Sequence, residues 1–133
     1  HESRDVIWLK RMFYSDPVVE DNEMARHLVC NILKQHGYAV LEFASSQACV
    51  NYFEESRASA HLLLSDIIMP EMNGKVLYQK LNKLNSDLKV IYMSGYPDDV
   101  IAHHGILESG MHFIQKPFSV NALLDKINEA LSH

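Results

Sequence analysis

Short apolar runs that alternate with helical patterns set the strongest limit on what this chain can fold into. The runs "HLLLSD" (residues 61–66) and "LKVIYMS" (88–94) are apolar without alternation, as expected for parallel strands covered on both faces. "YAVLEFA" (38–44) and "MHFIQKPF" (111–118) predict two more strands. All these runs are far shorter than a membrane span, so we expect no membrane contact.

Amphipathic helical patterns fill the segments between these runs. Apolar residues at helical spacing form one stripe in residues 22–37: Met24, Ala25, Leu28, Val29, Ile32 and Leu33. Further helices are predicted at 45–56, 74–85, 97–110 and 119–132. Strands that alternate with single helices indicate parallel βαβ units. The expected fold class is therefore α/β: a doubly wound parallel sheet with helices on both faces.

The composition is that of one globular domain and argues against a nucleic-acid partner. The chain has 133 residues, of which 47% are hydrophobic and 22% charged. Its net charge is −5 and its Lys and Arg residues are scattered, whereas binding to phosphate backbones needs clustered cations. The first residues lack a signal-peptide pattern, so we expect a cytoplasmic location, with Cys30 and Cys49 as buried free thiols.

Reactive side chains follow the ends of four predicted strands. Glu20-Asp21 come after Val18-Val19, Asp66 follows 62–65, Ser94 follows 90–93, and Lys116 follows 113–115. The carboxyl ends of parallel strands meet at one edge of a doubly wound sheet, where ligands bind. The sequence therefore predicts three acids, one hydroxyl and one ammonium around a shallow pocket.

The charges of this predicted pocket favour a divalent cation. Two carboxylates about 5 Å apart repel by roughly 3 kcal/mol at an effective dielectric constant near 20, and Lys116 alone cannot balance three acids. Oxygen ligands with room for water suit Mg²⁺. Asp66 is ionised at pH 7, because an ordinary aspartate has a pKa of about 3.9. It can therefore attack a phosphoryl group and form an aspartyl phosphate, with Ser94 and Lys116 contributing to the neutralisation of charge.

These motifs resemble the receiver domain of two-component response regulators. Glu20-Asp21, "SDIIMPEMNG" (65–74), "MSG" (93–95) and "KPF" (116–118) occur in that family's order and spacing. The wording of residues 92–118 is similar to receivers at the C-terminus of hybrid sensor histidine kinases. The resemblance implies a receiver domain over residues 15–133, preceded by a linker or N-terminal extension at 1–14. It also implies the family's flavodoxin-like fold, a five-stranded parallel sheet of order 2-1-3-4-5.

The resemblance also implies a role for each residue of the set. Asp66 would be the phosphoacceptor, and Ser94 and Lys116 would contact phosphoryl oxygens. Mg²⁺ would be held by Asp21, Asp66, the backbone carbonyl of Ile68, and Glu20 directly or through water. Ser94 and Phe113 would be switch residues that move on phosphorylation. Lys116-Pro117 would be a cis peptide, and Gly74 would serve the turn into a helix.

A receiver of this kind would take a phosphoryl group from a histidine kinase or a histidine phosphotransfer domain and then change its affinity for partners. It would catalyse its own phosphorylation and slow hydrolysis, so it is a switch more than an enzyme. A homodimer is a further interaction such a domain can make. The alternative is a phosphorylation-independent pseudo-receiver that acts as an interaction module, although the intact acid, Ser and Lys set argues against it.

Two other classes that share parts of this pattern fit less well. Phosphatases of the haloacid dehalogenase type also use a nucleophilic Asp, but they need a second Asp two residues later, where this chain has Ile68. A flavin-binding flavodoxin needs a Gly/Ser/Thr-rich phosphate loop after the first strand, and none follows here.

The first strand departs from the family pattern. In "YSDPVVED" (14–21), Asp16 and Pro17 fall where buried strand residues belong. Proline removes a ladder hydrogen bond and is poorly tolerated in a central strand, which this one is expected to be. We therefore expect a short strand from Val18 to Glu20 with a frayed start.

Overall fold

The computed structural model describes residues 15–95 and 111–132, so the helix predicted at 97–110 and the segment 1–14 lie outside the described residues. The elements follow in this order: β1 (Asp16–Val19), α2 (Glu23–Gln35), β2 (Val40–Phe43), α3 (Ser46–Ser56), β3 (Leu62–Asp66), α4 (Gly74–Leu84), β4 (Lys89–Ser94), β5 (Phe113–Gln115) and α6 (Val120–Leu131). Within these residues, five parallel strands form one sheet of order β2-β1-β3-β4-β5. The predicted fold class is confirmed.

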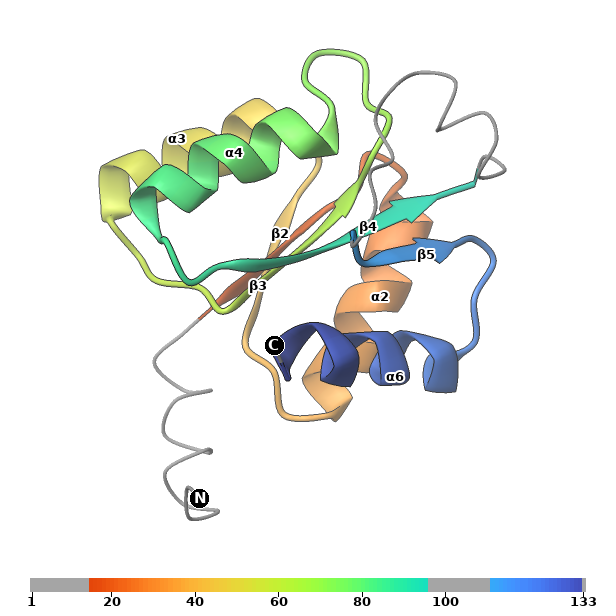
Figure 1. Cartoon of the computed structure of the whole chain (residues 1–133). Coiled ribbons are helices and arrows are strands. Elements are labelled where there is room, and N and C mark those ends of the chain that lie inside the picture. Colours follow the sequence, from red (N-terminus) through yellow and green to blue (C-terminus); the bar gives the residue numbers. More distant parts are fainter. Residues whose placement is uncertain (1–14, 96–110, 133) are drawn as a thin grey trace.

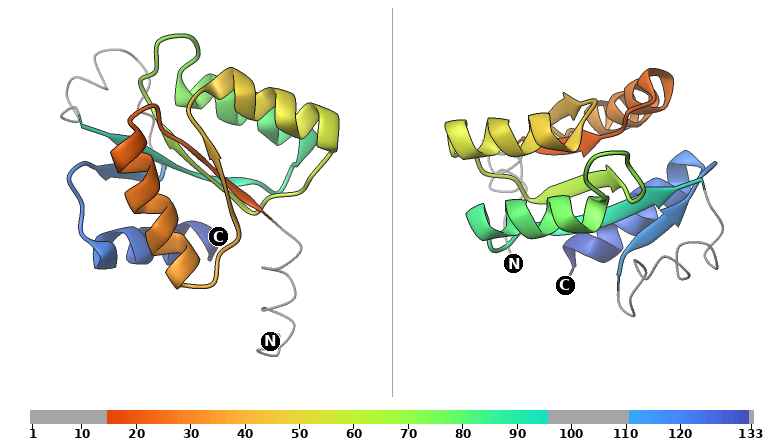
Figure 2. Two further views of the ribbon diagram at one scale, coloured as in Figure 1. Left: turned by 180° about the vertical axis from the view of Figure 1, so that it is seen from behind. Right: turned by 90° about the horizontal axis from the view of Figure 1, so that it is seen from above.

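Helices cover both faces of the sheet (Figures 1 and 2), with α3 and α4 on one face and α2 and α6 on the other. Leu63 of β3 packs with α3 and α4 in one apolar cluster, whereas Leu62 and Leu64 pack with α2 and α6 in another. The unbroken apolar run of β3 therefore reflects burial on both faces.

Polar side chains cap the first turns of α2, α3, α4 and α6. Each of four side chains accepts a hydrogen bond from a backbone N–H in the first turn, at 2.9 to 3.2 Å: Asn22 for α2, Ser45 for α3, Asn73 for α4 and Ser119 for α6. A cap of this kind stabilises a helix by about 1 kcal/mol. At the other end of α2, Gly37 has a φ of 86°, a left-handed conformation that glycine adopts without strain.

The prediction for the first strand was wrong at its start. β1 begins at Asp16, includes Pro17 and pairs with β2 over all four of its residues. Its ladder with β3 includes only Val18 and Val19, because proline offers no N–H to a second neighbour. The middle strand is β3, although β1 is still flanked on both sides.

Asp16 explains how a charged residue can begin a buried strand. Its carboxylate Oδ1 accepts hydrogen bonds from the backbone N–H groups of His61 (2.9 Å) and Leu62 (3.1 Å) at the start of β3. Asp16 is only 5% exposed, so these bonds replace water. The acid that seemed out of place in the sequence ties β1 to β3.

The apolar stripe of α2 is only partly buried by the rest of the fold. Val29, Ile32 and Leu33 are buried against the sheet, whereas Met24 is 84% and Leu28 61% exposed. The stripe is wider than the face that the sheet and α6 cover. The first two turns of α2 consequently carry apolar side chains in contact with solvent.

Both cysteines are free and buried, as predicted. Burial raises the pKa of Cys30 to about 12, with Glu42 raising it further, and burial alone raises the pKa of Cys49 to about 12. Both side chains are therefore neutral thiols at physiological pH, and they act as packing residues.

Candidate functional site

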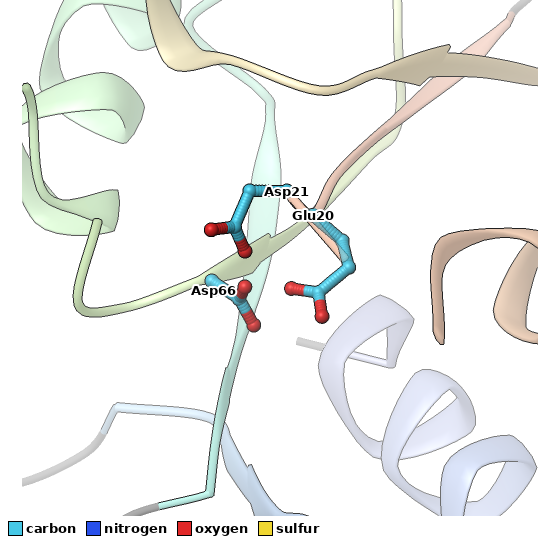
Figure 3. Close-up of side chains that lie close together, drawn as sticks. All are labelled: Glu20, Asp21 and Asp66. Carbon is cyan, nitrogen blue, oxygen red and sulfur yellow. The ribbon is translucent and has the colours of Figure 1, made fainter. Parts of the chain in front are cut away.

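Three acids meet at the carboxyl ends of β1 and β3. Glu20 and Asp21 follow β1 directly, and Asp66 is the last residue of β3. Their carboxylates gather in Figure 3, and one oxygen from each lies within 4.8 Å of the others. Glu20 and Asp66 are only 2% and 7% exposed, whereas Asp21 is exposed to solvent. The predicted acid cluster is thus present, and its geometry could hold a metal ion.

Lys116 inserts its ammonium group between two of these acids. Its Nζ lies 2.8 Å from Glu20 Oε1 and 2.7 Å from Asp66 Oδ1. The Lys116 backbone N–H donates to the Ser94 carbonyl at 2.7 Å, which joins the ends of β4 and β5. The sequence predicted Lys116 in the pocket but not its pairing with Glu20. No local pattern signals a contact between residues 96 positions apart.

The site has more negative charge than its one ammonium balances. Of the residues that line the cavity, three are acids and Lys116 is the one cation. Among the described residues, the buried Glu20 Oε2 has no hydrogen-bond partner. Burial raises the pKa of Asp66 above its ordinary value, and the Lys116 ammonium partly opposes that shift. Excess buried carboxylate oxygens are the chemistry that a hard divalent cation satisfies.

The cavity itself is open and polar, with a volume of about 330 Å³. The residues that line it are Glu20, Asp21, Asn22, Asp66, Ile68, Met93, Ser94, Gly95 and Lys116. It brings together every residue predicted for phosphoryl or metal chemistry. Asn22 and Met93 were missed, since Asn22 was assigned only to the helical segment 22–37 and Met93 to the strand 88–94.

Phe113 does not line this cavity. It is half-buried at the start of β5, and it packs with the cluster around Ile67 and Tyr92, which also contacts Ile68. The predicted switch position is therefore close to the loop that follows Asp66, but its movement stays a prediction.

Gly74 closes the loop that leads from Asp66 to α4. Its N–H donates to the Ile67 carbonyl at 2.8 Å, and a Cβ at this position would lie 2.4 Å from the Asp66 carbonyl oxygen. The glycine is required because the first turn of α4 approaches β3 too closely for a side chain. The Lys116-Pro117 peptide is cis, as the resemblance implied.

Comparison with known proteins decides the family. Residues 17–128 match the response regulator receiver domain family. The chain belongs to this family. It is a receiver domain of two-component systems, whose members interact with histidine kinases or phosphotransfer proteins.

The relatives of this receiver include parts of larger kinases and free-standing regulators. It is 34% identical over 114 residues to the sensor kinase CckA of Brucella abortus (strain 2308), covering 86% of this chain but 12% of the kinase. It is 29% identical over 123 residues to the response regulator receiver protein CpdR of the same strain, covering 92% of this chain and 98% of CpdR.

Solved structures of other proteins have the same fold as this chain. The crystal structure of the receiver domain from the hybrid histidine kinase CckA matches with a TM-score of 0.72 and 29% identity, covering 88% of this chain and 98% of that one. The Vibrio cholerae chemotaxis protein CheY4 matches with a TM-score of 0.74 at 19% identity, covering 90% of this chain and 99% of that one, which supports the fold alone. Among the described residues, no helix is long and apolar enough to cross a membrane.

Proposed function

We propose that this receiver accepts a phosphoryl group on Asp66 from a phosphohistidine of a histidine kinase or histidine phosphotransfer domain. The supporting observation is the arrangement of Asp66: a buried carboxylate at a strand end, beside two more acids and one ammonium, facing an open polar cavity. A structural acid would have all of its oxygens paired, and this cluster does not.

The transfer step is balanced by groups in the cavity. An Asp66 oxygen forms the new O–P bond while the P–N bond to the donor imidazole breaks, and the imidazole leaves with the electron pair and takes up a proton. Lys116 and Ser94 both line the cavity, and we propose that the Lys116 ammonium pairs with one phosphoryl oxygen while the Ser94 hydroxyl donates to another. Mg²⁺, held by Glu20, Asp21, Asp66 and the Ile68 carbonyl, would supply the remaining neutralising charge when bound.

An apolar groove next to the cavity supports contact with a helical donor. The groove has a volume of about 230 Å³, is lined by Leu28, Val29, Pro117 and Phe118, and shares Glu20, Met93 and Lys116 with the polar cavity. The exposed Leu28 side chain extends this surface along α2. A helix whose apolar face covered the groove could bring its histidine to Asp66.

Phosphorylation is proposed to act through Ser94 and Phe113. The phosphoryl group added to Asp66 would draw Ser94 inward and leave space for Phe113 to turn inward, which would change the partner surface around β4 and β5. Phe113→Ala should then weaken phosphorylation-dependent partner binding by about tenfold, or 1.4 kcal/mol. Binding that remained equally dependent on phosphorylation would contradict this role.

We also propose that residues 15–133 form the receiver and that 1–14 are a linker or extension. The family match, which begins at residue 17, supports this boundary. The relation to the CckA sensor kinase supports a place within, or beside, a hybrid kinase.

Incubation with acetyl phosphate and Mg²⁺, followed by intact mass measurement, tests the proposed function. We expect a gain of one phosphoryl group that disappears with Asp66→Asn and with EDTA. A folded wild-type protein that gains no phosphoryl group, yet binds its partner unchanged, would identify a pseudo-receiver.

A further inference from the structure

We propose that Ser46 is a positioning residue that holds the β3–α4 loop (residues 67–73), in which Ile68 lines the cavity of the cation site. This inference rests on the proposed function, because it concerns the same cation. It assigns a role to a residue on α3 that lies outside the acid cluster.

The Ser46 hydroxyl is directed at the loop and not at its own helix. Ser46 is the first residue of α3 and is 3% exposed. Its Oγ donates to the Met72 carbonyl at 3.0 Å and lies 3.4 Å from Met69 Sδ. The cap of α3 is supplied by the preceding Ser45. Ser46 is thus a buried donor whose partners are 23 and 26 positions away in the sequence.

The two ends of the loop are fixed by backbone hydrogen bonds, whereas its middle depends on Ser46. The Ile67 N–H donates to Met93, and the Ile67 carbonyl accepts from Gly74. For residues 68–72, the hydrogen bonds found within the described part of the chain come from the Ser46 hydroxyl. The half-buried Met69 and Met72 side chains add apolar packing, which is less directional than a hydrogen bond.

The loop also has empty space behind it. On one side, Ile68 lines the polar cavity with Asp66 and Lys116. On the other, Met69 and Met72 line a second cavity of about 160 Å³, together with Asp21, Ser45 and Ser46. A loop bordered by two cavities has fewer packing contacts to resist a shift, although Met69 and Met72 also pack against the apolar cluster of α3 and α4. The Ser46–Met72 bond connects the loop to the rigid start of α3 and sets its position.

A Mn²⁺ titration of Ser46→Ala, followed by the electron paramagnetic resonance signal of free Mn²⁺, tests this role. Loss of one neutral hydrogen bond, about 1 kcal/mol, predicts about fivefold weaker binding. Ser45→Ala is the matched control: it removes the α3 cap and lowers Tm but leaves the loop bond, so it should bind Mn²⁺ like the wild type. Equal affinity of Ser46→Ala and wild type, or an equal loss in Ser45→Ala, would overturn the inference.

Amide hydrogen exchange of the metal-free protein separates this inference from the proposed function. We expect the Gly74 amide, which closes the loop by its hydrogen bond to the Ile67 carbonyl, to exchange about fivefold faster in Ser46→Ala than in wild type, and unchanged in Ser45→Ala. Unchanged exchange in Ser46→Ala would refute the role of Ser46 whatever the metal result. A wild type that does not bind Mn²⁺, with faster loop exchange in Ser46→Ala, would instead refute the proposed cation chemistry and leave the loop contact established.

Discussion

Buried acids lie at both ends of β1, and they have opposite surroundings. At the start of the strand, Asp16 is 5% exposed and its carboxylate accepts two backbone hydrogen bonds from the start of β3. At the other end, Glu20 and Asp66 are equally buried but share the single ammonium of Lys116. Glu20 Oε2 has no hydrogen-bond partner in the described part of the chain.

The difference shows that burial alone does not identify a functional acid. A carboxylate that accepts backbone N–H groups is part of the fold, because those bonds replace its hydration. Carboxylates that lie close together with too few hydrogen-bond donors repel one another, and a bound cation lowers this repulsion. Substitutions at the two ends should therefore separate stability from chemistry.

The largest effect is expected at the start of β1, where the Asp16 carboxylate is part of the fold. Asp16→Ala leaves two N–H groups of β3 without their acceptor, so we expect the free energy of unfolding to fall by about 3 kcal/mol. Urea denaturation would measure this loss, and the folded fraction should still take up phosphate. Asp87→Ala is the control at an exposed position and should change stability by less than about 0.5 kcal/mol. An Asp16→Ala protein that kept its stability but took up no phosphoryl group would show that Asp16 serves the chemistry and not the fold.

Gly74→Ala tests the close packing beneath the functional end. The added Cβ would meet the Asp66 carbonyl oxygen at 2.4 Å, so we expect a loss of about 2 kcal/mol of stability together with slower phosphoryl uptake. Gly95→Ala is the matched control, since a Cβ there meets nothing within 4 Å. Similar melting temperatures for the two variants would show that the approach of α4 to β3 is not tight.

Lys116→Met tests how the Lys116 ammonium affects cation binding by Glu20 and Asp66. Removing the ammonium should strengthen Mn²⁺ binding by about tenfold, or 1.4 kcal/mol, because a positive charge no longer competes for Glu20 and Asp66. The same variant should take up phosphate more slowly. Lys80→Met, an exposed lysine on α4, changes the net charge equally and should leave Mn²⁺ affinity nearly unchanged. Weaker binding in Lys116→Met would mean that Lys116 organises the acids instead of competing for them.

The smallest effect concerns pH. Burial raises the pKa of Asp66 in the folded protein, so the wild type loses stability as pH rises from below 3.8 through the raised value. Asp66→Asn cannot ionise and should be more stable at pH 7 in EDTA, with a Tm higher by about 2–4 °C. This advantage should vanish in acid. A Tm difference that stayed constant across this range would exclude the buried charge as its cause.

Local patterns predicted most of the fold. The double-sided burial of β3 follows from its unbroken apolar run, and α2, α3, α4 and α6 begin within one residue of the predicted helical ranges. The contacts that organise the site were not predictable, because they join residues far apart in the sequence. Asp16 meets Leu62 across 46 positions and Lys116 meets Glu20 across 96, and neither pairing has a local signature.

Some residues were predicted correctly, but the physical reason for their position lies in contacts that the sequence does not reveal. Gly74 was expected in a turn, but its requirement comes from the approach of α4 to Asp66. Met24 and Leu28 fit a helical stripe, yet the width of the covered face leaves both exposed. Periodicity identifies which residues share a side of a helix, while the tertiary arrangement decides how much of that side is buried.

The central claim is that the unbalanced acid cluster makes Asp66 the phosphoacceptor. The most direct measurement is to treat the protein with acetyl phosphate and Mg²⁺, reduce the acyl phosphate with borohydride, and map the reduced residue by peptide mass spectrometry. The account predicts conversion at Asp66 alone, dependent on the divalent cation. Reduction at Asp16, Asp21 or any other acid, or phosphate held in a form that borohydride does not reduce, would contradict it.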